Sequence, residues 1–184
     1  CTAQLRQQLH GTPFLRHILN SAGIARFPQY QYDMVRLGIC LYGISTMPIP
    51  AMQGLRRVSS LHTIIISIKE WEAGTTIGYS RRGVLSRRSR IATIPVGYAD
   101  GLDRHLGCGR SSVWINGHRC PIVGNICMDA CMIDVTDAPC AVGDMVEIFG
   151  EHITVDELAE TLGTIPYEIL TSVSTRVKRI YYRE

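Results

Sequence analysis

The sequence predicts a mainly β chain, in which a short α/β segment precedes a compact, barrel-like, antiparallel β domain. After residue 55 the chain consists of short β-rich segments with turn signals between them. The gaps between these segments are too short for the helices that connect parallel strands, so antiparallel pairing is favoured. Residues 1–50 differ, because they follow the order strand, helix and strand that is typical of an α/β barrel.

The first 50 residues contain two apolar runs around a short helix. Gln4–Gln8 has a helical composition. The first apolar run, His17–Asn20, ends in an Asn-Ser turn, and a helix is expected over Ala22–Phe27. The second run, Met34–Gly43, is apolar and punctuated by glycine. Polar residues at the ends of such strands are where α/β barrels build their sites.

A proline-rich stretch, Met47–Pro50, interrupts regular structure and is expected to act as a linker. We therefore expect two domains, at residues 1–47 and 48–184. The chain starts at Cys1 without an initiator methionine and without the charged and apolar layout of a signal peptide. From this start we expect a piece cut from a longer protein.

The β domain is marked by alternating apolar segments and by one strong hairpin signal. Asn116-Gly117 lies between two β-rich segments and is a typical two-residue hairpin turn. Strands are expected at Leu61–Lys69, Arg90–Val96, Ser111–Ile115, His118–Val123, Cys131–Asp134 and Met145–Phe149.

A helix is predicted over Thr154–Leu162, near the end of the chain. Thr154 followed by Glu157 forms a capping box, and Gly163 is a typical C-terminal stop. A second helix over Tyr167–Thr175 and a closing strand over Val177–Tyr182 are expected to follow.

Composition and charge argue against several classes of protein. The hydrophobic fraction is 46% and the charged fraction 19%, which allows a buried core. No apolar run approaches the roughly 18 residues of a membrane span. The net charge of +3 is too small and too dispersed for a nucleic-acid partner. The densest basic stretch, 81–90, predicts a solvated hairpin or loop, or alternatively an anion or subunit contact.

The cysteines indicate a reducing compartment rather than a disulfide framework or a metal site. Their number is seven, which is odd, and their spacing is irregular. Free thiols in a cytoplasmic protein are the default expectation. Cys127 and Cys131 are near His118, but no C-x-x-C pair is present, so no metal site is predicted.

Taken alone, few residues indicate a reaction. Tyr79, between Gly78 and Ser80-Arg81-Arg82, is expected in a loop. Positive charge beside a phenol favours its phenolate, which can act as a base. A surface tyrosine that packs on a hairpin is the alternative. Asp100 and Asp129 lie in turn-like contexts, as turn formers or as orienting groups, and Glu168 suits the first turn of a helix.

The ordered set of short motifs is more informative than any one of them. This set resembles the second half of alanine racemases, and the similarity extends from about His17 to the end. In order, the motifs are Asn20-Ser21-Ala22, Val35-Arg36-Leu37-Gly38-Ile39-Cys40-Leu41-Tyr42-Gly43, Gly78-Tyr79, Pro95-Val96-Gly97-Tyr98-Ala99-Asp100-Gly101, Pro121-Ile122-Val123-Gly124, Cys127-Met128-Asp129, Pro166-Tyr167-Glu168 and Arg176-Val177-Lys178-Arg179.

The resemblance implies a fold, a cofactor and an assembly. Members have a (β/α)₈ barrel that holds pyridoxal 5'-phosphate, followed by a β domain, and form head-to-tail homodimers with shared active sites. It implies that residues up to about 45 are the last part of the barrel and that the rest is the β domain. The implied reaction interconverts L- and D-alanine in the cytoplasm and supplies D-alanine for peptidoglycan.

The resemblance also assigns cofactor-binding roles by position. Ser21 matches a phosphate-binding serine, and Gly38 and Ile39 match residues whose backbone N–H groups hold the phosphate. Tyr167 matches a tyrosine that reaches the phosphate. Arg36 matches the arginine that faces the pyridine nitrogen, where a guanidinium can donate a hydrogen bond but does not readily release a proton.

Catalytic and substrate-binding roles follow in the same way. Racemisation needs two acid/base groups on opposite faces of Cα, and Tyr79 matches the tyrosine that serves one face from the neighbouring subunit. Met128 matches the residue whose backbone amide contacts the substrate carboxylate. Tyr98 and Arg104 match the narrow entrance corridor, which favours a small amino acid.

Two departures from the family pattern affect these expectations. The lysines of the chain are Lys69 and Lys178, and neither has the sequence context of the cofactor lysine, so we expect the chain alone to be inactive. Asn125 stands where many members have a corridor arginine, and Gly78-Tyr79-Ser80 replaces a more usual Ser-Tyr-Gly. The alternatives are a non-catalytic β module for dimerisation or docking, and a racemase for serine or a basic amino acid such as lysine.

Overall fold

In the computed structural model of the chain, residues 2–9, 12–45, 47 and 49–182 are described. The chain divides into two compact units, Cys1–Val58 and Ser59–Glu184. The expected domain limit between residues 47 and 48 stays a prediction, and residue 48 lies outside the described residues. No helix in the described part of the chain is long and apolar enough to cross a membrane.

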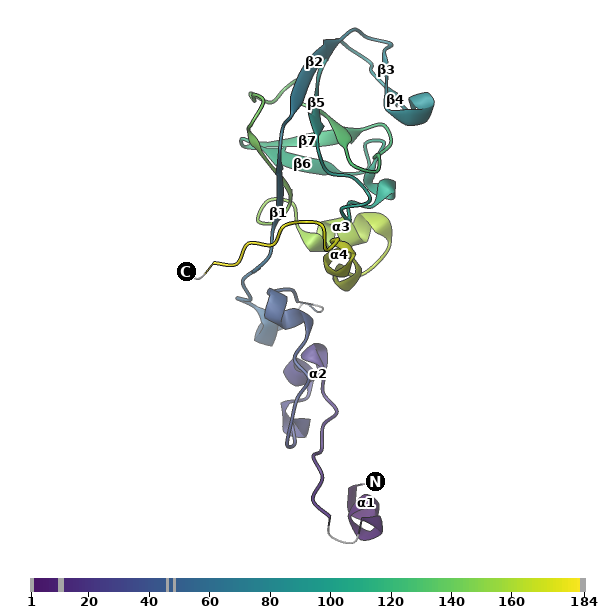
Figure 1. Ribbon diagram of the computed structural model, residues 1–184. Coiled ribbons are helices and arrows are strands. Elements are labelled where there is room, and N and C mark those ends of the chain that lie inside the picture. Colours follow the sequence, from purple (N-terminus) through teal and green to yellow (C-terminus); the bar gives the residue numbers. More distant parts are fainter. Residues whose placement is uncertain (1, 10–11, 46, 48, 183–184) are drawn as a thin grey trace. The chain divides into compact units, whose positions relative to one another are not determined.

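The second unit is built around one antiparallel seven-stranded sheet (Figure 1). All its pairings are antiparallel, which confirms the predicted fold class. In spatial order the strands are β1 (Leu61–Ile64), β9 (Met145–Phe149), β6 (Ser112–Ile115), β7 (His118–Val123), β8 (Cys131–Asp134), β5 (Ser89–Ile94) and β2 (Ser67–Trp71).

The two outer strands of this sheet, β1 and β2, are consecutive pieces of one segment. The single strand predicted over Leu61–Lys69 was therefore wrong. The Ile65 N–H donates to the Asp144 carbonyl at 3.0 Å, and the Ile66 N–H donates to the Thr93 carbonyl at 2.9 Å. The chain thus leaves partner β9 and joins partner β5 within two residues. Such a bend turns the corner between two faces of a sheet, so the sheet curves back on itself like a barrel.

Alternating burial along the strands builds the core inside the barrel. In β8, Cys131 and Ile133 are fully buried while Met132 is half-buried, and in β6 the buried positions are Val113 and Ile115. Full burial of one such aliphatic side chain contributes about 1.5–3 kcal/mol to folding. Because successive side chains point to opposite faces of a strand, one face of each strand lines the interior of the barrel.

A small hairpin that was not predicted lies beside this sheet. Its strands are β3 (Thr76–Ile77) and β4 (Gly83–Val84), which pair antiparallel. Two-residue strands are too short to give a periodic pattern. Ile77 and the following Leu85 pack with Ile91 in a cluster of their own, so the hairpin is anchored on the sheet.

The helix predicted after β9 is present as α3 (Val155–Leu162). The Thr154 side chain accepts the Glu157 N–H at 3.0 Å, and Gly163 ends the helix at φ +68°. A second helix, α4 (Pro166–Ser172), follows. Figure 1 shows α3 and α4 at one end of this unit and the β3–β4 hairpin at the other.

The C-terminal segment departs from prediction. The helix α4 ends at Ser172 rather than at Thr175, and the described residues after it form no strand where Val177–Tyr182 was expected to close the fold. The chain just before the expected strand bonds to a loop, and the Val177 N–H donates back to the Ser174 carbonyl at 3.1 Å instead of to a strand edge. The Ser174 N–H donates to the Asp100 carbonyl at 3.0 Å.

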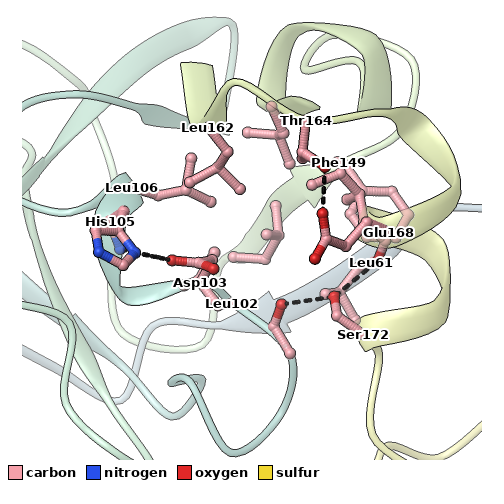
Figure 2. Close-up of a pocket in the computed structure, with 14 residues that line it drawn as sticks. Leu61, Leu102, Asp103, His105, Leu106, Phe149, Leu162, Thr164, Glu168 and Ser172 are labelled. Carbon is pink, nitrogen blue, oxygen red and sulfur yellow. Dashed lines mark hydrogen bonds and ion pairs between the residues drawn. The ribbon is translucent and has the colours of Figure 1, made fainter. Parts of the chain in front are cut away.

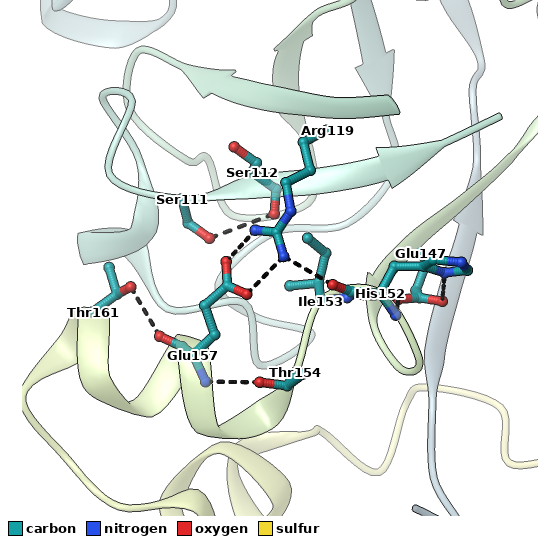
Figure 3. A network of polar contacts seen from close by, with 9 residues as sticks. All are labelled: Ser111, Ser112, Arg119, Glu147, His152, Ile153, Thr154, Glu157 and Thr161. Atoms are coloured by element: carbon teal, nitrogen blue, oxygen red, sulfur yellow. Dashed lines mark hydrogen bonds and ion pairs between the residues drawn. The ribbon is translucent and has the colours of Figure 1, made fainter. Parts of the chain in front are cut away.

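A polar network fixes the loop between β9 and α3 (Figure 3). The buried carboxylate of Glu147 accepts the N–H groups of His152 at 2.8 Å and Ile153 at 2.9 Å. Arg119 donates to the His152 carbonyl at 2.9 Å and to the Glu157 carboxylate at 2.9 Å. The network therefore joins β7, β9 and the first turn of α3.

The first unit contains short helices separated by extended chain. They are α1 (Thr2–Gln8), α2 (Ser21–Arg26), η1 (Pro28–Tyr30), η2 (Ile39–Tyr42) and η3 (Pro50–Met52), where η denotes a 3-10 helix. The helix expected over Ala22–Phe27 is present one residue earlier, and the Asn20 side chain caps it by accepting the Gly23 N–H at 3.0 Å.

The strands expected in this unit are not formed within its described residues. Two extended stretches instead lie parallel, because the Asp33 N–H donates to the Arg16 carbonyl at 3.2 Å and the Arg36 N–H donates to the Leu19 carbonyl at 2.9 Å. Both bonds join residues with the same sequence separation, as in a parallel pair connected by a helix. These isolated bonds do not make the continuous ladder of a strand.

Candidate active site

Tyr79 lies at the tip of the β3–β4 hairpin, in the single turn η4 (Tyr79–Arg81). Its side chain is 74% exposed. The chain around it is unusual, since Gly78 has φ +77° and ψ 177°, a conformation available essentially to glycine alone. Ser80 and Arg81 also have positive φ, at 59° and 52°. The tyrosine is therefore presented to solvent by a backbone that its surroundings must hold in place.

Asn125 supplies part of that support. Its Nδ2 donates to the Tyr79 carbonyl oxygen at 2.9 Å, and its Oδ1 accepts from the Cys108 thiol at 3.7 Å. The stem of the hairpin packs against the same stretch. A Cβ on Gly83 would lie 2.8 Å from the Gly124 nitrogen, so only glycine permits this approach.

Two further loops bring Tyr98 and Met128 together. The Tyr98 N–H donates to the Cys127 carbonyl at 3.0 Å, and the Ala99 N–H donates to the Met128 carbonyl at 3.0 Å. The backbones are so close that a Cβ on Gly97 would lie 2.2 Å from the Cys127 oxygen. The side chains of Tyr98 and Met128, two of the residues predicted to bind substrate, are exposed.

Arg176 connects these two loops by ion pairs. Its Nε donates to Asp100 at 2.7 Å and its Nη2 donates to Asp129 at 2.6 Å. The hydrogen bond from Arg176 holds the pKa of Asp100 below its usual value, against the opposing effect of burial, and the Gly97 N–H acts in the same direction as Arg176. The same pairs raise the pKa of Arg176. The aspartates therefore serve to fix the loops.

Arg104 lies in the turn η5 (Arg104–Leu106) and belongs to the same region. Burial raises the pKa of the Cys127 thiol, and the charge of Arg104 acts in the opposite direction. The Cys108 N–H donates to the Gly124 carbonyl at 2.7 Å. The turn that carries Arg104 thus packs on the stretch that also supports Tyr79.

An open groove of about 500 Å³ borders Tyr79. Its walls include Lys69 and Trp71 from the exposed edge strand β2, and Cys127 and Met132. One of the two lysines of the chain therefore lies on the same groove as the predicted catalytic tyrosine.

Tyr167 is exposed and lies on α4. Through the Ser172 hydroxyl, which donates to the Gly101 carbonyl at 3.2 Å, this helix contacts the loop that follows Tyr98.

A separate cavity of about 320 Å³ lies beside α3 and α4 (Figure 2). Asp103 and His105 lie on one side, paired at 2.8 Å, and Glu168 lies on the other, where it accepts from Thr164. Each of these polar groups bonds to a neighbour on its own side of the cavity. Within the described chain, none of the site residues predicted from the sequence lines this cavity, and we place the candidate site at the Tyr79 groove instead.

The first unit holds the remaining predicted residues in a group of their own. Ser21 is 3% exposed, and its hydroxyl accepts the Gly38 N–H at 2.9 Å. Ile39 follows Gly38 and is buried. Arg36 lies two residues before Gly38, and its guanidinium donates to the Ile18 carbonyl at 3.2 Å. The Gly38 N–H is therefore directed at the Ser21 hydroxyl oxygen.

Comparison with known families matches both units. Residues 58–181 match the model of the alanine racemase C-terminal domain, and residues 1–46 match the model of the alanine racemase N-terminal domain. The chain belongs to the alanine racemase family. The first model covers more than half of the chain, and the order of the two matches is the order of the two units.

Relatives and solved structures agree with this membership. Alanine racemase 1 of Clostridium acetobutylicum is 43% identical over 176 residues, covering 92% of this chain and 45% of that protein. The alanine racemase structure from Clostridium difficile 630 has a TM-score of 0.90 at 36% identity, covering 98% of this chain and 47% of that one. A structure from Bartonella henselae, with covalently bound pyridoxal phosphate, has a TM-score of 0.84 at 36% identity, with coverages of 98% and 50%.

This member of the alanine racemase family spans about half the length of the curated relatives it matches. Two of its structural residues could not be assigned from the sequence. Arg176 was noted only as part of a motif, and its partners Asp100 and Asp129 were equally suited to be turn formers. Asn125 was noted only as a departure from the family. The contacts of both span long stretches of sequence, for which no local pattern exists.

Proposed function

We propose that this chain supplies Tyr79 as one of the two proton-transfer groups of a racemase that interconverts L- and D-alanine with pyridoxal 5'-phosphate. One observation carries the proposal. In a chain of the alanine racemase family, the Tyr79 side chain is 74% exposed while its main chain is bonded to the buried Asn125. A mobile phenol would be a poor acid/base group, whereas an exposed phenol on a supported loop can meet a ligand held elsewhere.

The reaction requires a proton to leave one face of Cα and another to arrive at the opposite face. When bound, pyridoxal 5'-phosphate supplies the electron sink that makes the Cα proton removable. The Tyr79 Oη accepts a proton from its face in one direction of the reaction and returns a proton there in the other. We assign the second face to a lysine outside these 184 residues, because Lys69 and Lys178 lack the expected context.

The donors in the first unit fit a phosphate group. The Ser21 Oγ accepts the Gly38 N–H at 2.9 Å, which leaves the Ser21 hydroxyl proton to donate to an anionic oxygen. A Cβ on Gly38 would meet only the Ser21 Oγ, at 3.6 Å, which leaves the approach open. We propose that Ser21, Gly38 and Ile39 hold the phosphate and that Arg36 donates to the pyridine nitrogen. A permanently protonated guanidinium holds that ring nitrogen without protonating it. For Tyr167, in the second unit, we propose contact with a cofactor phosphate because its position in the family implies it.

Substrate selection is proposed for the joined loops of the second unit. The Met128 backbone amide binds the substrate carboxylate, and Tyr98 and Arg104 narrow the entrance so that a small amino acid is favoured. The Tyr98 and Met128 loops are bonded to each other at 3.0 Å, which supports an entrance of fixed width.

We propose a head-to-tail homodimer in which Tyr79 acts on cofactor held by the partner subunit, and a role in making D-alanine for peptidoglycan. A cytoplasmic location is supported by the free thiols of the described cysteines, since reduced thiols persist there.

The test is reconstitution. The 184-residue chain is mixed with a separately produced, lysine-bearing barrel portion, and conversion of L-alanine is followed by chiral separation. We expect activity from the mixture and none from either part. Tyr79→Phe should abolish the activity, whereas Tyr181→Phe, at a tyrosine that is 87% exposed, should leave it unchanged.

The same assay separates the alternatives. Activity from this chain alone, lost in Lys69→Arg, would contradict the assignment of the lysine. Full activity in Tyr79→Phe would contradict the role of the tyrosine. Faster conversion of serine or lysine than of alanine would show that alanine is not the preferred substrate. A mixture that associates without any turnover would favour a docking module.

A further inference from the structure

We propose that Asn125 is the positioning residue for Tyr79, acting through the main chain of the tyrosine rather than through its phenol. The inference rests on the proposed function of Tyr79. Asn125 does not line the Tyr79 groove, and its side chain is turned toward the hairpin instead. The residue thus has a task at this position that needs no contact with substrate.

The geometry of Asn125 uses both ends of its amide. Nδ2 donates to the Tyr79 carbonyl at 2.9 Å, and Oδ1 accepts the Cys108 thiol at 3.7 Å. The residue is 9% exposed, so water competes little for either bond. Because one end needs a donor and the other an acceptor, the orientation of the amide is fixed. Asn125 therefore couples the tip of the hairpin to the loop that also carries Arg104.

The tip needs such support because its backbone is strained. Ser80 and Arg81 have φ values of 59° and 52°, which side-chain-bearing residues adopt only when their surroundings hold them. Close packing fixes the stem, where a Cβ on Gly124 would lie 2.6 Å from the Ile77 oxygen. The Asn125 bond lies beyond this contact, at Tyr79 itself. Without it, the chain at the tip can relax while the stem stays docked.

The functional consequence is a loss of rate rather than of binding. The main chain of Tyr79 sets the position of Cα, and therefore the position from which the phenol reaches the substrate. A misplaced acid/base group lowers kcat steeply. For loss of one such hydrogen bond we expect a decrease in kcat of roughly tenfold, with KM changed less than about twofold.

The key variant is Asn125→Asp. It keeps the size of the side chain and the acceptor toward Cys108, but it replaces the donor with an oxygen that repels the Tyr79 carbonyl. Asn125→Ala removes the donor without adding charge, and it serves where the aspartate variant does not fold. The matched control is Asn116→Gly, which removes the same amide from the β6–β7 turn, where φ is 44° and glycine is tolerated.

The first readout uses the 184-residue chain without cofactor. Trypsin cleaves after Arg81 and Arg82, both exposed at the hairpin tip, and mass spectrometry compares this rate with cleavage after Lys178 in the C-terminal segment. We expect the ratio to rise at least about fivefold in the Asn125 variants, as loss of one stabilising hydrogen bond would produce, and to stay unchanged in Asn116→Gly. A ratio that does not rise would overturn the inference.

The second readout uses the reconstituted racemase. Impaired transfer at one face should raise the Cα-deuterium isotope effect in one direction of the reaction only, together with the lower kcat. Equal isotope effects in both directions, or an unchanged kcat beside a loosened tip, would overturn the role of Asn125. Failure of the proposed function itself shows in a different way, as full activity of Tyr79→Phe.

Discussion

Glu147 is the centre of the network that joins β9 to the loop before α3 (Figure 3). It is 7% exposed, and its Oε1 accepts two backbone N–H groups, from His152 at 2.8 Å and Ile153 at 2.9 Å. Its Oε2 lies 3.1 Å from the His152 Nδ1. The His152 ring stacks on Trp114 at a centroid distance of 4.4 Å. Removal of this carboxylate therefore leaves two backbone donors without an acceptor, one at the buried Ile153 and one at the exposed residue His152.

The expected cost follows from these contacts. Glu147→Ala leaves the buried Ile153 N–H unsatisfied and removes the acceptor of the part-buried His152 N–H, so we expect the free energy of unfolding to fall by about 3 kcal/mol. Glu147→Gln keeps a neutral acceptor for both donors and loses only the charge, so we expect a loss of about 1–2 kcal/mol. The ordering of the two variants follows from the loop contacts and not from the size of the side chain.

The charge of Glu147 also makes the stability lost in Glu147→Gln depend on pH. Burial would raise the pKa of Glu147, but the hydrogen bonds from Ile153 and His152 outweigh it, and the pKa lies below the usual value. A carboxyl whose pKa is lower in the folded state stabilises the fold above the pKa of the unfolded chain, about 4.3. That stabilisation is lost as the pH falls through the folded value. The difference between the native chain and Glu147→Gln should therefore be full at pH 7 and shrink below about pH 4.3.

The assay is urea unfolding followed by tryptophan fluorescence, since Trp114 reports on the stacked ring directly. Glu151→Ala, at an exposed neighbour in the same loop, is the control and should change the free energy of unfolding by less than about 0.5 kcal/mol. A Glu147→Ala variant no less stable than this control would refute the reasoning. The reasoning would also be refuted if the loss of unfolding free energy in Glu147→Gln stayed constant between pH 7 and pH 3.

Two substitutions and one labelling experiment test the loops and thiols. Arg176→Gln should raise the pKa of Asp100 by removing its main hydrogen bond, and an unchanged carboxyl titration by NMR would contradict the ion pair. Gly97→Ala should destabilise the fold by about 3 kcal/mol or more through backbone overlap at 2.2 Å, and native-like unfolding in urea would argue against it. Burial raises the pKa of Cys131 to about 12, so iodoacetamide at pH 8 should modify the exposed Cys108 and spare Cys131; equal labelling by mass spectrometry would count against this packing.

Local signals predicted the elements that depend on local interactions. The helix α3 could be placed because Thr154, Glu157 and Gly163 act within one turn of its ends. The β6–β7 hairpin followed from Asn116-Gly117, where both residues have the positive φ that this turn requires.

The elements that were missed depend on distant partners. The break between β1 and β2 falls in the run Ile64-Ile65-Ile66, which has no turn residue, and only the change of partner strand explains it. Just before the expected C-terminal strand, Arg176 contacts residues of two loops, and the described residues after it form no strand. A β-rich composition cannot distinguish a strand edge from a loop as the partner of such a segment.

The candidate site shows the same division. Local pattern left Tyr79 open to the interpretation of a surface tyrosine, and only the order of several motifs assigned it a catalytic role. The structure adds what neither could supply, which is the support of the tyrosine by Asn125, 46 residues away.

The predicted residues of the second unit depend on backbone contacts more than on their own side chains. Tyr79, Tyr98 and Met128 all have exposed side chains, yet each is fixed through a carbonyl or an N–H group. Side-chain substitution at these positions can therefore change chemistry without changing the loops. Substitution of the glycines that allow the loops to touch should do the opposite, and this separation is what makes the roles of these exposed residues testable one at a time.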